Sequence, residues 1–227
     1  MNTALKEWKT GYVKKTGASG SKLSIKEFIR TKGEEPFTTR IQQSAKGRKI
    51  LVIADFSGSI QSFQNEYKKA IVSSMEVLDG IGSKTALFSF GGQEGGGSTD
   101  GFFSVKKFEE PKWLQVHSAK TAVLTAEGGT PTADVYEGLS GYIRRHRPDV
   151  TLTLTDGGPN DPDLVKQEIA KLKTSTKMVA FGIGGNLEGA KQITTALDQF
   201  GYSKVFGVSN VSEIPRKLVA MIAPTSR

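Results

Sequence analysis

The chain has 227 residues, a formal net charge of +8 and no cysteine. Its length fits one large domain or one domain with an extension, and its 37% hydrophobic and 24% charged residues are ordinary for a globular protein. The lack of cysteine excludes disulfides, thiolate metal sites and cysteine-based catalysis. No apolar stretch reaches the length of a membrane-spanning helix, and residues 1–15 lack the apolar core of an export signal, so we expect a cytoplasmic protein.

The basic character is concentrated at the N-terminus. Residues 1–48 contain 11 Lys and Arg against 4 Asp and Glu, a net charge of +7, whereas residues 49–227 carry only +1. We therefore predict a basic N-terminal extension over residues 1–48 and a separate domain over residues 49–227. A basic arm can contact nucleic acid, an anionic membrane surface or an acidic protein, and it can equally be a lysine-rich segment that is simply solvated.

Within the extension, the pattern predicts one short helix and one strand. Ser24 precedes the helical pattern of residues 25–30 and can cap it, with Glu27 three residues further on. Residues 37–42 are expected to form a strand that leads into the first strand of the domain. Residues 17–21 have the composition of a loop.

From residue 49 onward the chain alternates between strand and helix patterns. Residues 49–54 form a continuous apolar run, as expected for a strand covered on both faces. A helix over 63–78 and a strand over 84–90 follow. After a loop with six glycines, residues 102–108 are expected to form an antiparallel edge strand. Residues 111–127 show no clear pattern.

The second half of the domain continues the alternation. Thr130 and Pro131 are expected to open a helix that runs to about residue 146, and Asp161 and Pro162 open another. The remaining predicted elements are strands over 150–155, 177–183 and 204–208, and helices to residue 173, over 187–200 and over 211–223. This alternation predicts an α/β fold with a mainly parallel sheet and helices on both faces.

Two carboxylates follow predicted strands of this sheet. Asp55 begins the segment Asp-Phe-Ser-Gly-Ser, which also contains Ser57 and Ser59, and Asp156 follows the strand over 150–155. If the two strands are neighbours, the carboxylates approach each other at the edge where such sheets bind ligands. Two carboxylates about 4 Å apart repel by about 4 kcal/mol at an effective dielectric of about 20, and a divalent cation removes that repulsion. Hydroxyl oxygens with few charged ligands suit Mg²⁺ better than Ca²⁺.

These segments, with Gly-Gly-Thr-Pro-Thr at residues 128–132, resemble the metal-ion-dependent adhesion site (MIDAS) of von Willebrand factor A (vWA) domains. The resemblance covers residues 49–223 and is nearest to prokaryotic intracellular members. It implies a Rossmann-like sheet of about six strands that binds Mg²⁺ or Mn²⁺ and is not an enzyme. The implied metal site consists of Asp55, Ser57, Ser59, Thr130 and Asp156, with the hydroxyls as direct or water-mediated ligands and the carboxylates mainly in the outer shell.

The resemblance also implies a partner. A protein that offers Asp or Glu would complete the metal's coordination, and in relatives this partner can be an AAA+ ATPase. The rim around the metal is expected to include Phe56, Gly129 and Gly157.

Other interpretations remain open at this point. Asp55 and Ser57 can form a turn that caps the next helix, and Asp156 with Gly157 can form an ordinary turn. A second functional hypothesis is nucleic-acid binding through residues 1–48. A third is metal-dependent phosphotransfer or hydrolysis, although no second acid or nucleophile follows Asp55 in its segment.

Overall fold

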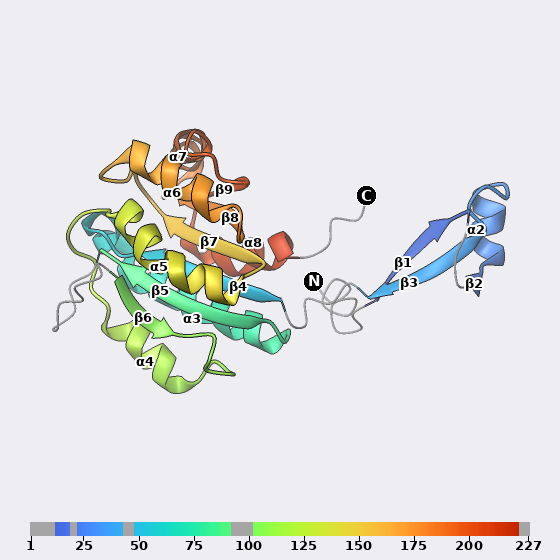
Figure 1. Ribbon diagram of the computed structural model, residues 1–227, viewed down its shortest axis with the longest axis horizontal. Helices are drawn as coiled ribbons and strands as arrows, with labels where there is room; N and C mark the ends of the chain where they lie inside the picture. Colours follow the sequence, from blue (N-terminus) through green and yellow to red (C-terminus); the bar gives the residue numbers. More distant parts are fainter. Residues whose placement is uncertain (1–11, 19–21, 43–47, 92–101, 223–227) are drawn as a thin grey trace. The chain divides into compact units, whose positions relative to one another are not determined.

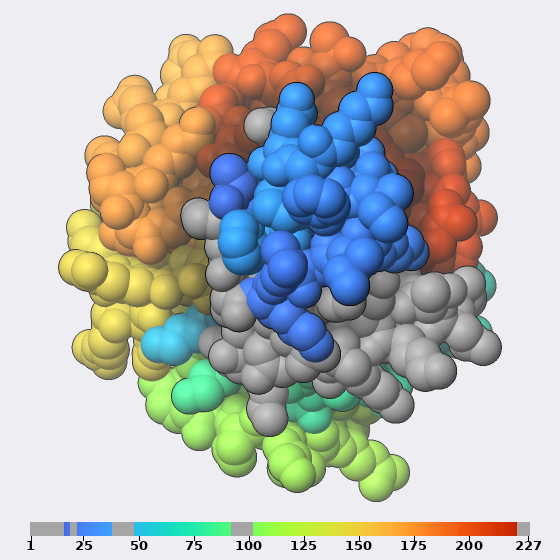
Figure 2. All heavy atoms as spheres, turned by 90° about the vertical axis from the view of Figure 1, so that its right-hand side faces the viewer, coloured from blue at the N-terminus to red at the C-terminus, as the bar shows by residue number. Residues whose placement is uncertain are grey.

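The computed structural model describes residues 12–18, 22–42, 48–91 and 102–222. The chain divides into two compact units, one made of Met1–Gly47 with Met221–Arg227, and the other of Arg48–Ala220. The strands and helix of the first unit are blue in Figure 1, and atoms of the same unit are blue in Figure 2. None of the described helices is both long enough and apolar enough to cross a membrane.

The small unit is an antiparallel sheet with one helix. Its elements are β1 (Tyr12–Gly17), β2 (Lys22–Leu23), α2 (Ile25–Arg30) and β3 (Phe37–Gln42), with the strand order β1-β3-β2. Ser24 caps α2 as predicted, because its hydroxyl accepts a hydrogen bond from the Glu27 main-chain N–H over 3.4 Å. The strand expected over 37–42 is present, but it pairs with β1 and β2 rather than leading into the sheet of the large unit.

The large unit alternates strands and helices along the chain. Its elements are β4 (Lys49–Asp55), the 3₁₀ turn η1 (Gly58–Phe63), α3 (Gln64–Gly80), β5 (Lys84–Phe90), β6 (Phe102–Lys106), α4 (Gln115–Val123), α5 (Thr132–His146), β7 (Val150–Thr155), α6 (Pro162–Leu172), β8 (Lys177–Ile183), α7 (Leu187–Asp198), β9 (Lys204–Val208), the 3₁₀ turn η2 (Val211–Glu213) and α8 (Ile214–Ile222).

The six strands of this unit form one sheet in the order β6-β5-β4-β7-β8-β9. All neighbouring pairs are parallel except β5 with β6, so the predicted mainly parallel sheet with one antiparallel edge strand is confirmed. From β4 the chain first adds strands on one side, and from β7 it adds them on the other. The strand order therefore reverses between β4 and β7, which is where α/β sheets form ligand sites.

Helices cover both faces of the sheet, as Figure 1 shows, with α5 and α6 in front of it and α3 and α8 behind. Alternate residues of a strand point to opposite faces, so a strand covered on both sides is apolar throughout. On the α5 side, Leu51 and Ile53 of β4 share one buried cluster with Tyr136, Ile169 and Leu197, which come from α5, α6 and α7. The continuous apolar run of β4 is therefore explained by burial on both faces.

Two local differences from the sequence-based expectations have physical reasons. Helix α5 begins at Thr132 without a side-chain cap, because its N-cap residue is Pro131, whose side chain cannot accept a hydrogen bond, and Thr130 lies one residue earlier. Helix α4 lies within residues 111–127, for which the sequence showed no clear pattern. Its buried residues are the polar His117 and Thr121, whereas the apolar Val116 and Val123 are exposed. A helix with polar residues inside and apolar residues outside has no periodic apolar signal.

Candidate metal centre

The loop after β4 holds two hydroxyls beside a buried carboxylate. Asp55 is the last residue of β4 and is fully buried. Its Oδ1 accepts a hydrogen bond from the Ser57 main-chain N–H over 2.8 Å, which closes a tight turn. The hydroxyls of Ser57 and Ser59 then lie 3.0 Å apart and are hydrogen-bonded to each other. The segment therefore forms the turn of the alternative interpretation, but Ser57 makes no side-chain capping hydrogen bond to the 3₁₀ turn that follows it. The same turn brings the oxygens together.

The neighbouring strand β7 supplies the second carboxylate. Ala54 pairs with Leu154 in the sheet, so the residues that follow each strand emerge at the same edge. Ser59 Oγ donates a hydrogen bond to Asp156 Oδ1 over 2.8 Å. Thr155 Oγ1 donates to Asp55 Oδ2 over 2.6 Å. The structure therefore brings together four of the five predicted site residues, namely Asp55, Ser57, Ser59 and Asp156.

The fifth predicted residue, Thr130, is brought to this edge by its backbone. The Gly58 N–H donates to the Gly128 carbonyl over 3.0 Å, so the loop before α5 lies against the loop after β4. The Thr130 N–H donates to Asn160 Oδ1, and the Asn160 N–H donates to the Thr130 carbonyl, both over 3.0 Å. Within the described residues, the Thr130 hydroxyl makes no hydrogen bond to the other four side chains.

The close approach of three loops depends on glycine. Gly91 directly follows β5 and has a φ of +85°, and a Cβ there would lie 2.6 Å from the Ser57 nitrogen. Gly128 has a φ of +71°, and its Cβ would lie 3.1 Å from the Gly91 carbonyl oxygen. Any larger residue at position 91 would displace the loop that carries Ser57.

No cation of the described part of the chain compensates the two carboxylates. Burial raises the pKa of Asp55 to about 6, although hydrogen bonds from Thr155 and Ser57 act in the opposite direction, and the charge of Asp156 raises it further. Burial also raises the pKa of Asp156, against a lowering effect of the hydrogen bond from Ser59. Among the described residues neither carboxylate forms an ion pair. The site therefore has an excess of negative charge near neutral pH.

The oxygen atoms of the site fit a hard divalent cation. Two carboxylates and two hydroxyls converge here. The described part of the chain contains no other type of metal site made of three or more His, Cys, Asp and Glu side chains. Oxygen-only donors are typical of Mg²⁺, Ca²⁺ and Mn²⁺ sites. Asp55 and Ser57 are buried whereas Ser59 is exposed, so the cluster opens to solvent on one side.

One expected rim residue lies elsewhere. The side chain of Phe56 is only 1% exposed, and its ring centroid lies 5.2 Å from that of Tyr67. Phe56 is thus part of the core between the sheet and α3, and it does not form the rim. Gly129 is exposed and Gly157 is half-buried.

Two residues near the site were not recognised from the sequence. Thr155 holds Asp55, and Asn160 holds Thr130. A weak signal exists for each, because Thr155 immediately precedes Asp156 and Asn160 lies in the turn before the cap of α6. Neither signal indicates which side chain is the partner, since the partners are distant in sequence.

Comparison with solved structures identifies the fold. The pilus adhesin SpaC of Lactobacillus rhamnosus GG aligns with a TM-score of 0.61 at 14% identity, over 78% of this chain and 30% of that chain. Proximal thread matrix protein 1 of the mussel byssus, solved with a zinc-occupied MIDAS motif, aligns with a TM-score of 0.59 at 18% identity, over 79% and 48%. A von Willebrand factor type A structure from Catenulispora acidiphila aligns with a TM-score of 0.54 at 15% identity, over 94% and 49%.

No protein-family model matches the sequence, and no curated protein matches it. The chain spans less than a third of SpaC and about half of each of the other two chains. At these identities the likeness establishes the fold. The chain has the vWA fold, which confirms the Rossmann-like architecture expected from the sequence.

Proposed function

We propose that this protein is a non-enzymatic binding module in which a divalent metal captures an acidic residue of a partner protein. The observation that carries the proposal is the hydrogen-bonded chain from Ser57 through Ser59 to Asp156, which joins the ends of two neighbouring strands where the strand order reverses. An unbalanced pair of carboxylates lies in the same place. The vWA fold supports the proposal, and a structural neighbour has a MIDAS motif occupied by zinc.

In this proposal the hydroxyls of Ser57, Ser59 and Thr130 bind the metal directly or through water. Asp55 and Asp156 lie behind them and balance the charge of the ion. The metal supplies a Lewis-acidic position that a partner's carboxylate can occupy. Mg²⁺ is the proposed ion because neutral hydroxyls leave coordination positions for water, and Mn²⁺ fits the same donors.

Binding rather than catalysis is proposed because both histidines are engaged elsewhere. His117 Nε2 lies 2.8 Å from Glu110 Oε1, and the His146 ring packs against Tyr142 at a centroid distance of 4.3 Å. The hydrolytic alternative has its own test. Turnover of a generic phosphoester that is lost in Asp55→Ala would favour an enzyme.

The proposal is tested by metal-dependent stabilisation. Mg²⁺ and Mn²⁺ are titrated into the wild type, Ser57→Ala/Ser59→Ala and the control Ser203→Ala, which changes an exposed serine on another loop. An ion at a free concentration of about 100 times its Kd raises the free energy of unfolding by about 2.7 kcal/mol. For a domain of this size that corresponds to roughly 5–10 °C in Tm. We expect this rise in the wild type and the control only, and equal or absent shifts in all three would contradict the proposal.

A second candidate function is nucleic-acid binding through residues 1–48. The observation that favours it is the charge of +7 in this segment. Phosphate contacts would make the affinity for a duplex fall steeply between about 50 and 200 mM salt. Unchanged binding after Lys14→Gln/Lys15→Gln, or no binding at all, would contradict it.

A domain boundary near residue 48, an AAA+ ATPase as partner and a cytoplasmic location stay predictions from the sequence and the resemblance.

A further inference from the structure

A basic groove lies between α3 and α4. It is an open depression of about 550 Å³, lined by Lys68, Lys69 and Val72 of α3 and by Ser118 and Ala122 of α4, among others. Its charged lining residues are both lysines. Lys68 Nζ donates a hydrogen bond to the Ala122 carbonyl over 3.0 Å, and this contact ties the two helices together at the groove.

One segment of chain links the groove to the candidate metal centre. This segment starts at Ala122 on the groove and ends at Gly128, whose carbonyl accepts from the Gly58 N–H over 3.0 Å. Between these points the Ala126 N–H donates to Gln64 Oε1 over 3.3 Å, and the Glu127 N–H donates to the Phe56 carbonyl over 2.9 Å. The segment is thus fastened at both ends, to α3 and to the loop that carries Ser57.

No carboxylate is among the described residues that line the groove. In the described part of the chain neither Lys68 nor Lys69 forms an ion pair. Burial lowers the pKa of Lys68. The sequence from residue 49 onward is close to neutral overall, so this local positive charge is not part of a uniformly basic surface.

We propose that the partner segment is an acidic peptide stretch that binds at two points, with one carboxylate on the metal and a further acidic side chain in the groove beside Lys69. This inference rests on the proposed function and adds the chemistry of the partner to it. Charge complementarity selects the acidic segment, and the apolar wall at Val72 can accept its methylene groups.

The test uses two peptides and the whole 227-residue chain. One peptide consists of six glutamates, and the other has a single glutamate among five glutamines. A six-residue extended peptide spans about 20 Å, which allows contact with more than one point of the surface. Affinities are measured by fluorescence anisotropy with Mg²⁺ and with chelator.

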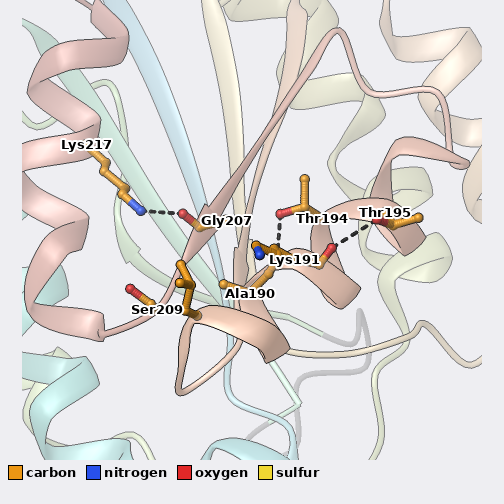
Figure 3. Close-up of a pocket in the computed structure, with 8 residues that line it drawn as sticks. Ala190, Lys191, Thr194, Thr195, Gly207, Ser209 and Lys217 are labelled. Carbon is orange, nitrogen blue, oxygen red and sulfur yellow. Dashed lines mark hydrogen bonds between the residues drawn. The ribbon is translucent and has the colours of Figure 1, made fainter.

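Lys69→Glu is the informative variant, because Lys69 is exposed and its side chain makes no hydrogen bond to another described residue. Lys191→Glu is the matched control. It makes the same charge change at an exposed lysine of α7, in a different pocket shown in Figure 3, where Thr194 and Thr195 donate to main-chain carbonyls of their own helix. Both variants retain the basic N-terminal residues, so any peptide binding there is common to both.

We expect hexaglutamate to bind the wild type more tightly than the single-glutamate peptide. Lys69→Glu is expected to weaken the binding of hexaglutamate by about twofold to fivefold, as for exposed charge pairs, and the binding of the other peptide by less than about twofold. Lys191→Glu should change neither affinity by more than about twofold. Carbodiimide coupling, which joins contacting carboxylates and amines, should link hexaglutamate to Lys68 or Lys69.

Three results would overturn the inference. Equal affinities of the two peptides would do so, as would equal effects of Lys69→Glu and Lys191→Glu. If chelator weakens the binding of both peptides while the two variants have equal affinities, only the proposed contact in the groove is wrong and the metal-dependent function stands. If chelator changes neither affinity, the proposed function fails and two-point binding fails with it.

Discussion

Thr155 holds the carboxylate of Asp55 from the neighbouring strand, through a hydrogen bond of 2.6 Å between Thr155 Oγ1 and Asp55 Oδ2. The other oxygen, Oδ1, accepts from the Ser57 N–H over 2.8 Å. Both oxygens of this buried carboxylate are therefore fixed by the protein, and its orientation does not depend on a ligand. The carboxylate in turn positions the turn that carries the Ser57 hydroxyl.

Replacing Thr155 by valine tests this relationship. Thr155→Val keeps the shape of the side chain but removes the donor, so Asp55 Oδ2 loses its hydrogen bond and the pKa of Asp55 rises further. Asp55 positions the turn of the proposed ligand Ser57, so we expect the metal affinity to fall by up to about tenfold, the lower end of the range for a lost contact to a metal ligand. Calorimetric titration with Mn²⁺ measures the effect. Thr195→Val, on the exposed side of α7, is the control, and equal affinities of the two variants would contradict this role of Thr155.

The pKa of Asp55 predicts how stability changes with pH in the absence of metal. The folded value of about 6 is above the ordinary value of 3.8, so folding favours the protonated form. The contribution of Asp55 to the free energy of unfolding is therefore fully present below about pH 4, and it is lost as the pH rises through about 6. The difference between the two pKa values corresponds to about 3 kcal/mol at most.

Asp55→Asn removes this titration while keeping the shape of the side chain. In chelator, urea unfolding should show similar stabilities of wild type and variant near pH 4, and a more stable variant near pH 7. Saturating Mg²⁺ should reverse the order at pH 7, because only the wild type gains binding energy. A variant that is less stable than the wild type in chelator at pH 7 would show that the buried charge is compensated.

Gly91 and Gly141 should respond in opposite ways to alanine. At Gly91 the positive φ and the contact with Ser57 predict a loss of about 2 kcal/mol or more, together with weaker metal binding. Gly141 lies in the middle of α5 with open space around it, so alanine there should stabilise the fold by about 0.5–1 kcal/mol. Urea unfolding and a metal titration distinguish the two variants. A tolerated Gly91→Ala would mean that the loop of Ser57 can shift without cost.

A buried hydroxyl chain beside the site is expected to support the fold alone. The Tyr136 hydroxyl lies 2.6 Å from Thr153 Oγ1 and 2.6 Å from the Tyr202 hydroxyl. Tyr136→Phe should lower the free energy of unfolding by about 1–3 kcal/mol, because the buried hydroxyls of Thr153 and Tyr202 each lose one hydrogen-bond partner. A double-mutant cycle with Tyr202→Phe should show a coupling energy above about 0.5 kcal/mol. Unchanged Mn²⁺ affinity is expected, and a loss would mean that the chain also positions the site.

Much of the fold could be predicted because its strands are buried on both faces. The strands β7, β8 and β9 begin and end where the apolar patterns predict, and Asp161 caps α6 through its bond to the Leu164 N–H. Strand β1 was not predicted, because an antiparallel strand of a small sheet has no such apolar run. Helix α4 was missed because polar His117 and Thr121 form its inner face.

The sequence by itself determined which oxygen-bearing residues follow the strands and hence which cation chemistry the site can support. Local patterns suffice for this, since strand ends and turns depend on neighbouring residues. Only the tertiary structure decided that β4 and β7 are neighbours, that Thr155 holds Asp55, that Asn160 holds Thr130 and that Phe56 is buried. These contacts join residues up to a hundred positions apart, and they arise from the packing of strands and helices, which no local pattern encodes.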